Sequence, residues 1–229
     1  MPIVRDVNGG AGGRGSTGDG TSVTGAAADT AAGAGSDADL RERLLDRRVL
    51  HRGRYLTFQV DQVERADGTR ATRDVCAHPG AVAIVALDAV GRVALVRQWR
   101  HPAGRSLLEI PAGTLEVDDA TGAVEDHSLA APRELEEETG LRAGSWRLLT
   151  RFWTAPGFTS ELMYLYLATD LRSAQADADR REPDEDERLH RILLPLSEAV
   201  AAVERREIQD AKSVIGLLWV ARLGQSGGT

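Results

Sequence analysis

Four glutamates crowd into five positions of the stretch "PRELEEETGL", which occupies residues 132–141: Glu134, Glu136, Glu137 and Glu138. On a helix, residues three and four apart share a face, so Glu134 and Glu138 are neighbours and Glu137 lies at the edge of that face. Convergent carboxylates resist joint ionisation unless a cation compensates them, and hard divalent ions such as Mg²⁺ take oxygen ligands. The spacing therefore indicates a cation site, with Glu136 pointing away into solvent.

A plainer interpretation is a solvent-facing helix whose charges balance one another. Arg133 and Glu137 are an i, i+4 pair, so the arginine can fix one of the carboxylates. Charge alone favours this plainer interpretation, because charged residues mostly face solvent. The order of the residues around the glutamates favours the cation site instead.

The stretch "RELEEETGL" has the order R-E-(apolar)-x-E-E-x-G-(apolar), which resembles the helix half of the Nudix hydrolase signature at every fixed position. The glutamate that the signature places eight residues before the arginine is present as Glu125. The glycine expected six residues before that glutamate is replaced by Asp119, and Gly113, in "EIPAG", lies six residues earlier. The loop between Gly113 and Glu125 thus carries a six-residue insertion, to which the sequence assigns no role.

The resemblance extends from about Arg47 to Leu223. The runs "VALVRQWRHPAGRSLLEIPAG", "FWTAPGFTSE", "EPDEDE" and "IQDAKSVIGLLW" are similar to the ADP-ribose pyrophosphatase branch of the family. The resemblance implies cleavage of ADP-ribose, a nucleoside-diphosphate sugar, to AMP and ribose 5-phosphate with Mg²⁺, or with Mn²⁺ as the alternative ion. It also implies a homodimer in which the subunits exchange an N-terminal β segment.

The resemblance further implies roles for individual residues. Metal ions neutralise a diphosphate and lower the pKa of a bound water. Glu134 and Glu138 are the expected main ligands, Glu137 a further ligand or orienter, and the carbonyl of Ala112 another oxygen donor. Arg133 is expected to hold Glu137 in place. Glu125 and Gly113 are expected to support the ligands from behind.

Substrate contacts are expected outside the glutamate helix. Arg97 and Arg100 lie on opposite faces of a predicted strand, so only one is expected to reach the diphosphate. The resemblance favours Arg100, and the alternative for Arg97 is a surface or dimer-interface charge. Glu109 is placed near the metals, with a structural carboxylate as the equal alternative. Tyr55 or Phe58 is expected to stack on adenine, with hairpin core as the alternative.

The general base is expected on a loop after the helix, by resemblance to this branch. The charged segment "EPDEDER" supplies Glu185 and Glu187, and "PGFTSE" supplies Glu161. Glu185 and Glu187 rank above Glu161. The alternative for each of them is simple solvated charge.

The elements that must position these residues form an α+β chain, expected to be a mixed-sheet α/β/α sandwich. Apolar runs predict strands over 80–87, 92–99, 146–154, 161–169 and 189–196. A helix is expected from Ser128, as its cap, to about Thr139, with Pro132 in the first turn and Gly140 after the end. Helices over 197–207 and 210–223 close the chain.

Three regions are expected along the chain. Residues 1–39 have almost no large apolar side chain, which indicates a disordered tail. Residues 40–78 read as a small N-terminal antiparallel β segment, the one exchanged in the dimer. Residues 79–224 are the expected Nudix hydrolase domain.

Bulk composition excludes several classes of function. The net charge of −7 argues against nonspecific nucleic-acid binding, which needs a basic surface. A single cysteine and the lack of a leader or an apolar span predict a cytoplasmic protein away from membranes. Two alternatives to ADP-ribose hydrolysis stay open: hydrolysis of another nucleoside-diphosphate sugar or dinucleotide, and ADP-ribose binding without hydrolysis.

Overall fold

The computed structural model describes residues 37–174, residue 181 and residues 188–226. Most of the predicted tail lies outside these residues. Its last three positions, with Leu40, form the short helix α1 (Asp37–Leu40). Within the described part of the chain, no helix is both long enough and apolar enough to cross a membrane.

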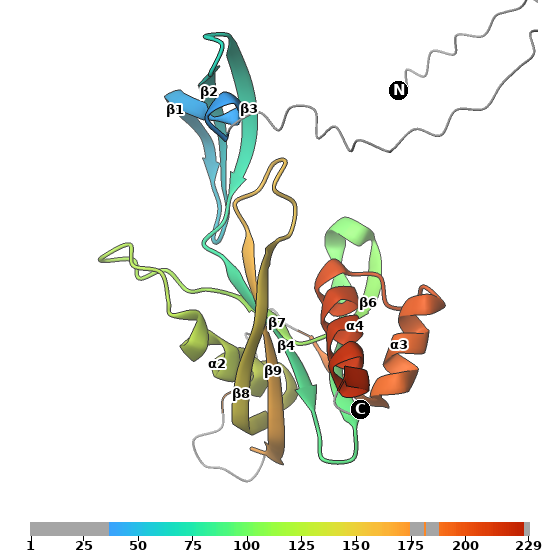
Figure 1. Cartoon of the computed structure of the whole chain (residues 1–229). Helices are drawn as coiled ribbons and strands as arrows, with labels where there is room; N and C mark the ends of the chain where they lie inside the picture. The colour runs from blue at the N-terminus through green and yellow to red at the C-terminus, as the bar shows by residue number, and fades with distance from the viewer. Residues whose placement is uncertain (1–36, 175–180, 182–187, 227–229) are drawn as a thin grey trace, which may run out of the picture.

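The first sheet has three antiparallel strands, which project away from the rest of the molecule (Figure 1). It consists of β1 (Glu42–Arg52), β2 (Thr57–Arg65) and β3 (Arg70–Ala77), in that order. Gly68, at a positive φ of 81°, lies in the tight turn between β2 and β3. Most of β1 is exposed, including Leu44 and Leu50.

The second sheet is mixed and has the strand order β10-β5-β4-β9-β8, with β6 beside β5 and β7 beside β4. Only the β4–β9 pair is parallel. A 3-10 turn, η1 (His101–Ala103), separates β5 from β6. The strands are β4 (Ala81–Leu87), β5 (Arg92–Arg100), β6 (Arg105–Glu109), β7 (Ala112–Thr114), β8 (Leu141–Trp153), β9 (Leu162–Ser173) and β10 (His190–Pro195).

Helices cover both faces of this sheet (Figure 1). Helix α2 (His127–Thr139) lies on one face, and α3 (Leu196–Glu204) and α4 (Ala211–Ser226) lie on the other. Strand β4, "AVAIVAL", is apolar throughout because it is buried on both sides. Its Val82 packs in the core under α2, and its Val85 in the core under α4. The predicted α/β/α sandwich is confirmed.

Two contacts tie the projecting sheet to the mixed sheet at the end of β3. The N–H of Cys76 donates to the carbonyl of Phe158 at 2.7 Å, and the N–H of Ser160 donates to the carbonyl of Cys76 at 3.2 Å. Both partners belong to the loop between β8 and β9. The base of the projecting sheet is thereby fixed beside the mixed sheet.

The start of α2 differs from the prediction. Asp126 is the cap, and its Oδ1 accepts from the N–H of Ser128 at 2.8 Å. A carboxylate next to the positive end of the helix is favoured there, which explains why Asp126 caps in place of Ser128. The cap lies two residues earlier than expected, so Pro132 lies in the second turn and not the first. Gly140 ends the helix as predicted, at a φ of 64°.

Candidate active site

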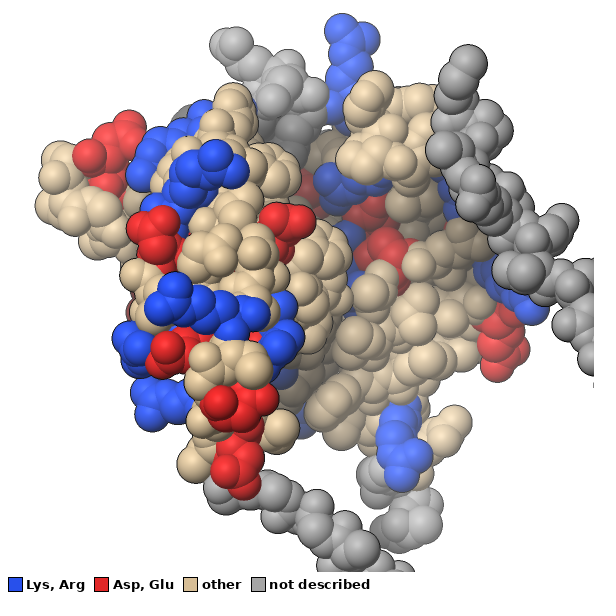
Figure 2. Space-filling view, turned by 90° about the horizontal axis from the view of Figure 1, so that it is seen from above, with Lys and Arg blue, Asp and Glu red and all other residues tan. Residues whose placement is uncertain are grey.

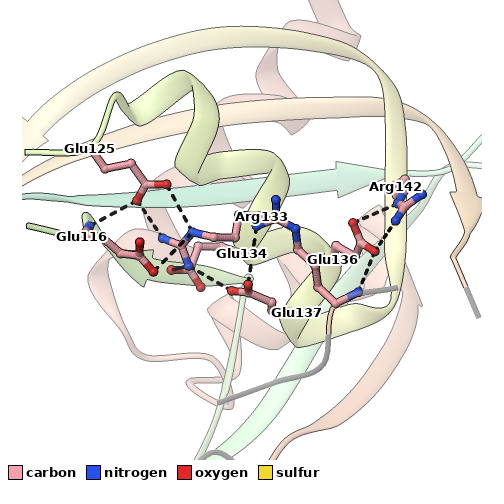
Figure 3. Close-up of polar contacts among 8 residues, drawn as sticks. Glu116, Glu125, Arg133, Glu134, Glu136, Glu137 and Arg142 are labelled. Carbon is pink, nitrogen blue, oxygen red and sulfur yellow. Dashed lines mark hydrogen bonds and ion pairs between the residues drawn. The ribbon is translucent and has the colours of Figure 1, made fainter. Parts of the chain in front are cut away.

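Arg133 lies at the centre of a cluster of carboxylates on α2 and the loop before it (Figure 3). Its Nη2 and Nε donate to Glu125 at 2.8 and 3.2 Å. Its Nη1 donates to Glu134 at 2.8 Å and to Glu137 at 2.9 Å. Glu116 lies 3.9 Å from the guanidinium. The expected Arg133–Glu137 pair is therefore present, within a larger network.

The charges in this network reinforce one another. Burial alone would lower the pKa of Arg133, but the hydrogen bond to Glu125 and the surrounding carboxylates raise its pKa above the usual value. Burial alone would raise the pKa of Glu125, but the hydrogen bonds from Arg133 and from the N–H of Glu116 hold its pKa below the usual value. Both groups are therefore charged at neutral pH, and the cluster keeps a fixed orientation.

Strand β7 brings the backbone of the "PAG" turn against α2. A Cβ atom added to Gly113 would lie 1.9 Å from the carboxylate of Glu134, so only glycine leaves that carboxylate its place. One residue earlier, the N–H of Ala112 donates to Oε2 of Glu138 at 2.9 Å. Glu134 and Glu138 are buried, at 8% and 5% exposure. The sequence-predicted residues Ala112, Gly113, Glu134 and Glu138 thus lie together.

Glu136 has a different environment from the one predicted. The prediction that it points into solvent is wrong, because it is 6% exposed. Its carboxylate accepts two hydrogen bonds from Arg142, at 2.9 and 2.7 Å, and one from the N–H of Arg181 at 3.0 Å. The hydrogen bonds from Arg142 lower the pKa of Glu136. This side of α2 packs on the start of β8, where Arg142 supplies the charge that solvent would otherwise provide.

A second ion network holds Arg100. Its Nε and Nη2 donate to the two oxygens of Glu109 at 2.8 and 2.7 Å. Lys212, on α4, also donates to Glu109 and to Asp210. Burial would raise the pKa of Glu109, which is 1% exposed, but Arg100 and Lys212 bring its pKa below the usual value. Glu109 therefore orients Arg100.

Both networks border one cavity of about 530 Å³, within the size range of small-molecule sites. Its wall combines three arginines with four carboxylates. The residues are Arg54, Tyr55, Pro79, Arg100, Ala112, Gly113, Thr114, Leu115, Glu116, Val117, Asp119, Arg133, Glu134 and Glu137. Figure 2 shows the molecule from above: acidic and basic side chains are intermingled on this surface, and some lie inside a hollow.

The structure separates the other predicted substrate residues. Arg100 lines the cavity, whereas Arg97 is exposed on β5 and is not part of the lining. Tyr55 lines the cavity, and Phe58 does not. Both aromatic side chains are 47% exposed, so neither forms the core of the hairpin.

The candidate bases are not brought to this cavity by the described residues. Glu161 accepts from the hydroxyl of Thr154 at 2.5 Å, lies 3.7 Å from Nε2 of His78 and is not part of the lining. Glu185 and Glu187 lie outside the described residues. The identity of the base stays a prediction.

The donor set fits a hard cation. Among the side chains that the structure describes, no three Asp, Glu, His or Cys residues form a ready-made metal group. The carboxylates of Glu134 and Glu137 nevertheless belong to the lining that includes Ala112, and Gly113 keeps the space of Glu134 clear. These donors are all oxygens, which suits Mg²⁺ or Mn²⁺ better than a softer ion.

The sequence did not predict two residues of α4 that support the residues around the cavity. Ser213 accepts the buried N–H of Ile110 at 2.7 Å, and Lys212 completes the pairing of Glu109. Both lie about a hundred residues from their partners, so no local sequence pattern predicts these contacts. One signal was present: Lys212 is the only lysine in a chain that uses arginine everywhere else.

Comparison with known proteins assigns the chain to a family. Residues 77–215 match the NUDIX domain family, so the chain belongs to the Nudix family. It is an enzyme of the Nudix hydrolase class, similar over most of its length to ADP-ribose pyrophosphatases.

Individual relatives support this assignment. The chain is 42% identical to an ADP-ribose pyrophosphatase of Mycobacterium tuberculosis, over 75% of this chain and 79% of the relative. It is 35% identical to one of Bacillus subtilis, over 79% and 93%. It is also 37% identical to a methanol dehydrogenase activator of Bacillus methanolicus, over 78% and 92%. The fold is similar to a solved ADP compounds hydrolase, with a TM-score of 0.67 and 24% identity over 82% of this chain and 96% of that one.

Proposed function

We propose that the protein hydrolyses the diphosphate bond of ADP-ribose, with Mg²⁺, to AMP and ribose 5-phosphate. The observation that carries the proposal is one cavity whose lining includes Glu134, Glu137 and Arg100. A diphosphate is bound by cations, and its hydrolysis needs both neutralisation and an activated water. The names of the relatives support ADP-ribose as the substrate.

In this proposal, Glu134 and Glu138 bind the metal, and Glu137 binds or orients it with the carbonyl of Ala112. When bound, the metal polarises the phosphoryl oxygens and lowers the pKa of a water. Arg133 holds Glu134 and Glu137 in one orientation, and Glu125 holds Arg133. These contacts preset the site, so little reorganisation accompanies substrate binding.

Arg100 binds the diphosphate in the same proposal. Two of its nitrogens are occupied by Glu109, which leaves Nη1 free of that pair. The rigid pairing lowers the entropy cost of presenting the guanidinium to a phosphate. Tyr55, half exposed on the cavity wall, is the proposed platform for adenine. Glu185 or Glu187 is the proposed general base.

We also propose a homodimer built on the projecting sheet. That sheet exposes a group of large apolar side chains, which single soluble domains rarely leave uncovered. Leu44 is 46%, Val49 38%, Leu50 57% and Phe58 47% exposed. A second copy of the chain would cover them. A cytoplasmic location and a small-molecule substrate, without nucleic acid or membrane, complete the proposal.

One experiment tests the substrate. The purified protein with Mg²⁺ is offered ADP-ribose, ADP-glucose, NADH and diadenosine polyphosphates, and AMP release is measured. The proposal expects the highest kcat/KM for ADP-ribose. A preference for another compound would replace the substrate and keep the hydrolase class. Tight binding of ADP-ribose without AMP release would instead indicate a binding module.

A further inference from the structure

The loop that carries the six-residue insertion between Gly113 and Glu125 contains a hairpin, residues 116–125, here called the insertion hairpin. We propose that it contacts the part of the substrate beyond the diphosphate, and that Asp119 is the specificity-determining residue there. Asp119 accepts hydrogen bonds from the hydroxyl groups of a sugar and disfavours a further phosphate in that place. The inference rests on the proposed function, since it takes a nucleoside-diphosphate sugar as the substrate class.

Backbone pairing makes this segment a hairpin and not a slack loop. The N–H of Glu125 donates to the carbonyl of Glu116 at 2.8 Å, and the N–H of Asp118 donates to the carbonyl of Ala123 at 2.9 Å. Val117 and Val124 form an antiparallel bridge between these two bonds. The six additional residues therefore continue a paired ribbon.

Asp118 organises the tip of the hairpin. Its Oδ1 accepts from the N–H of Ala120 at 3.0 Å, and from the N–H and hydroxyl of Thr121 at 2.7 and 2.8 Å. Gly122 completes the turn at a φ of 71° and donates to the carbonyl of Asp118 at 2.7 Å. The first aspartate of the pair "DD" is thus used within the turn, and the second is not.

The base of the hairpin is joined to the catalytic helix. Oε2 of Glu125 accepts both from the N–H of Glu116 at 3.2 Å and from Nη2 of Arg133 at 2.8 Å. Arg133 in turn holds Glu134 and Glu137. The hairpin is therefore positioned by the same guanidinium that orients the carboxylates of the cavity.

Val117 and Asp119 belong to the cavity wall on this side. Within the described part of the chain, the side chain of Asp119 makes no hydrogen bond and no ion pair, and it is exposed to solvent. An ionised carboxylate is an acceptor only, so it suits hydroxyl donors and opposes a phosphate. Arg54 and Arg100 supply the positive charge that the diphosphate itself needs.

The test compares Asp119→Ala and Asp119→Asn with Glu204→Gln, which also removes one negative charge but lies at the end of α3. The measured quantity is the ratio of kcat/KM for ADP-ribose to kcat/KM for ATP, which has a third phosphate where ADP-ribose has its sugar. We expect Asp119→Ala to lower this ratio about five- to tenfold, the size of one exposed hydrogen bond or screened charge. Asp119→Asn should lie between Asp119→Ala and the unaltered protein, and Glu204→Gln should leave the ratio unchanged.

An unchanged ratio in Asp119→Ala, or an unaltered protein that prefers ATP, overturns the role of the insertion hairpin. Failure of the proposed function has a different signature. If another nucleoside-diphosphate sugar is cleaved best, its ratio to ATP replaces that of ADP-ribose, and the same shift is expected. If nothing is cleaved, the ratio of dissociation constants for ADP-ribose and ATP, measured by calorimetry, is expected to shift in the same way.

Discussion

Gly113 and Glu134 are in such close contact that the Cβ of any other residue at position 113 would lie 1.9 Å from the Glu134 carboxylate. The atoms that such a Cβ meets are the far end of a flexible side chain, which can swing away without disturbing the backbone. Gly113→Ala should therefore spare the fold and displace Glu134. We expect kcat/KM to fall about 10- to 100-fold, the usual range for a misplaced partner of a metal site.

Gly157→Ala is the matched control for this change, because a Cβ there meets nothing within 4 Å. Activity as a function of Mg²⁺ concentration and thermal unfolding would be measured for both variants. A loss of stability in Gly113→Ala with unchanged Mg²⁺ dependence would contradict the expected displacement.

Two glutamates of α2 should respond in opposite ways to loss of charge. Glu138→Gln keeps an oxygen for the N–H of Ala112 but loses the charge proposed to bind the metal, so activity should fall about 100-fold with little change in melting temperature. Glu136→Gln removes the charge that accepts two hydrogen bonds from Arg142 and should cost about 1–3 kcal/mol of stability while sparing activity at low temperature. Full activity of Glu138→Gln with Mg²⁺ would falsify the assignment of Glu138.

The acid side of the stability curve should depend on Glu109. Its pKa in the folded protein is below the ordinary value of 4.5, so the unfolded chain binds its proton first as the pH falls. The stability that Glu109 contributes is complete above that ordinary value and is lost as the pH falls through the lowered pKa. Glu109→Gln should flatten this loss.

Melting temperatures between about pH 7 and pH 3 check this prediction, since that window spans the ordinary carboxyl pKa. Glu207→Gln is the control, because Glu207 also has a lowered pKa but its ion pair with Arg205 is on the surface. If both variants reduced the loss of melting temperature at low pH equally, the assigned contribution of Glu109 would be wrong.

The projecting sheet should control the oligomeric state. Leu50→Asp places a charge among its exposed apolar side chains and should halve the mass measured by light scattering. Val90→Asp, which changes an exposed valine in the β4–β5 turn, should leave the mass unchanged. A monomeric unaltered protein would rule out the proposed dimer.

The site could be predicted from the sequence where its geometry is local. The spacing of Glu134 and Glu138 on one helix follows from helix geometry alone, and the structure brings both against the "PAG" turn. Helix geometry did not predict the environment of Glu136. Its partner Arg142 lies beyond the end of the helix, and helix geometry does not show which residues of other elements pack against a helix face. Lys212 could not be predicted either, because it lies 103 residues from Glu109 in the sequence and only tertiary packing brings the two together.

The fold followed from apolar runs of strand length, which the buried strands β4, β5 and β9 require. The pairing of the insertion hairpin could not be predicted from the sequence. Its residues carry turn signals but lack the apolar pattern that would distinguish a paired ribbon from a loop. At its base, Glu125 also accepts a hydrogen bond from Arg133 on the next helix, a contact that the local sequence does not reveal.

The backbone bond between Glu116 and Glu125 has an evolutionary consequence. Because the two strands of the ribbon meet at that bond, residues can be gained or lost beyond it without moving Glu125 or the helix that follows. A change in the length of the tip is therefore expected to leave the carboxylates of α2 in place. In evolution, the tip that we propose to contact the sugar can therefore change in length and charge separately from the carboxylates that we propose to bind the metal.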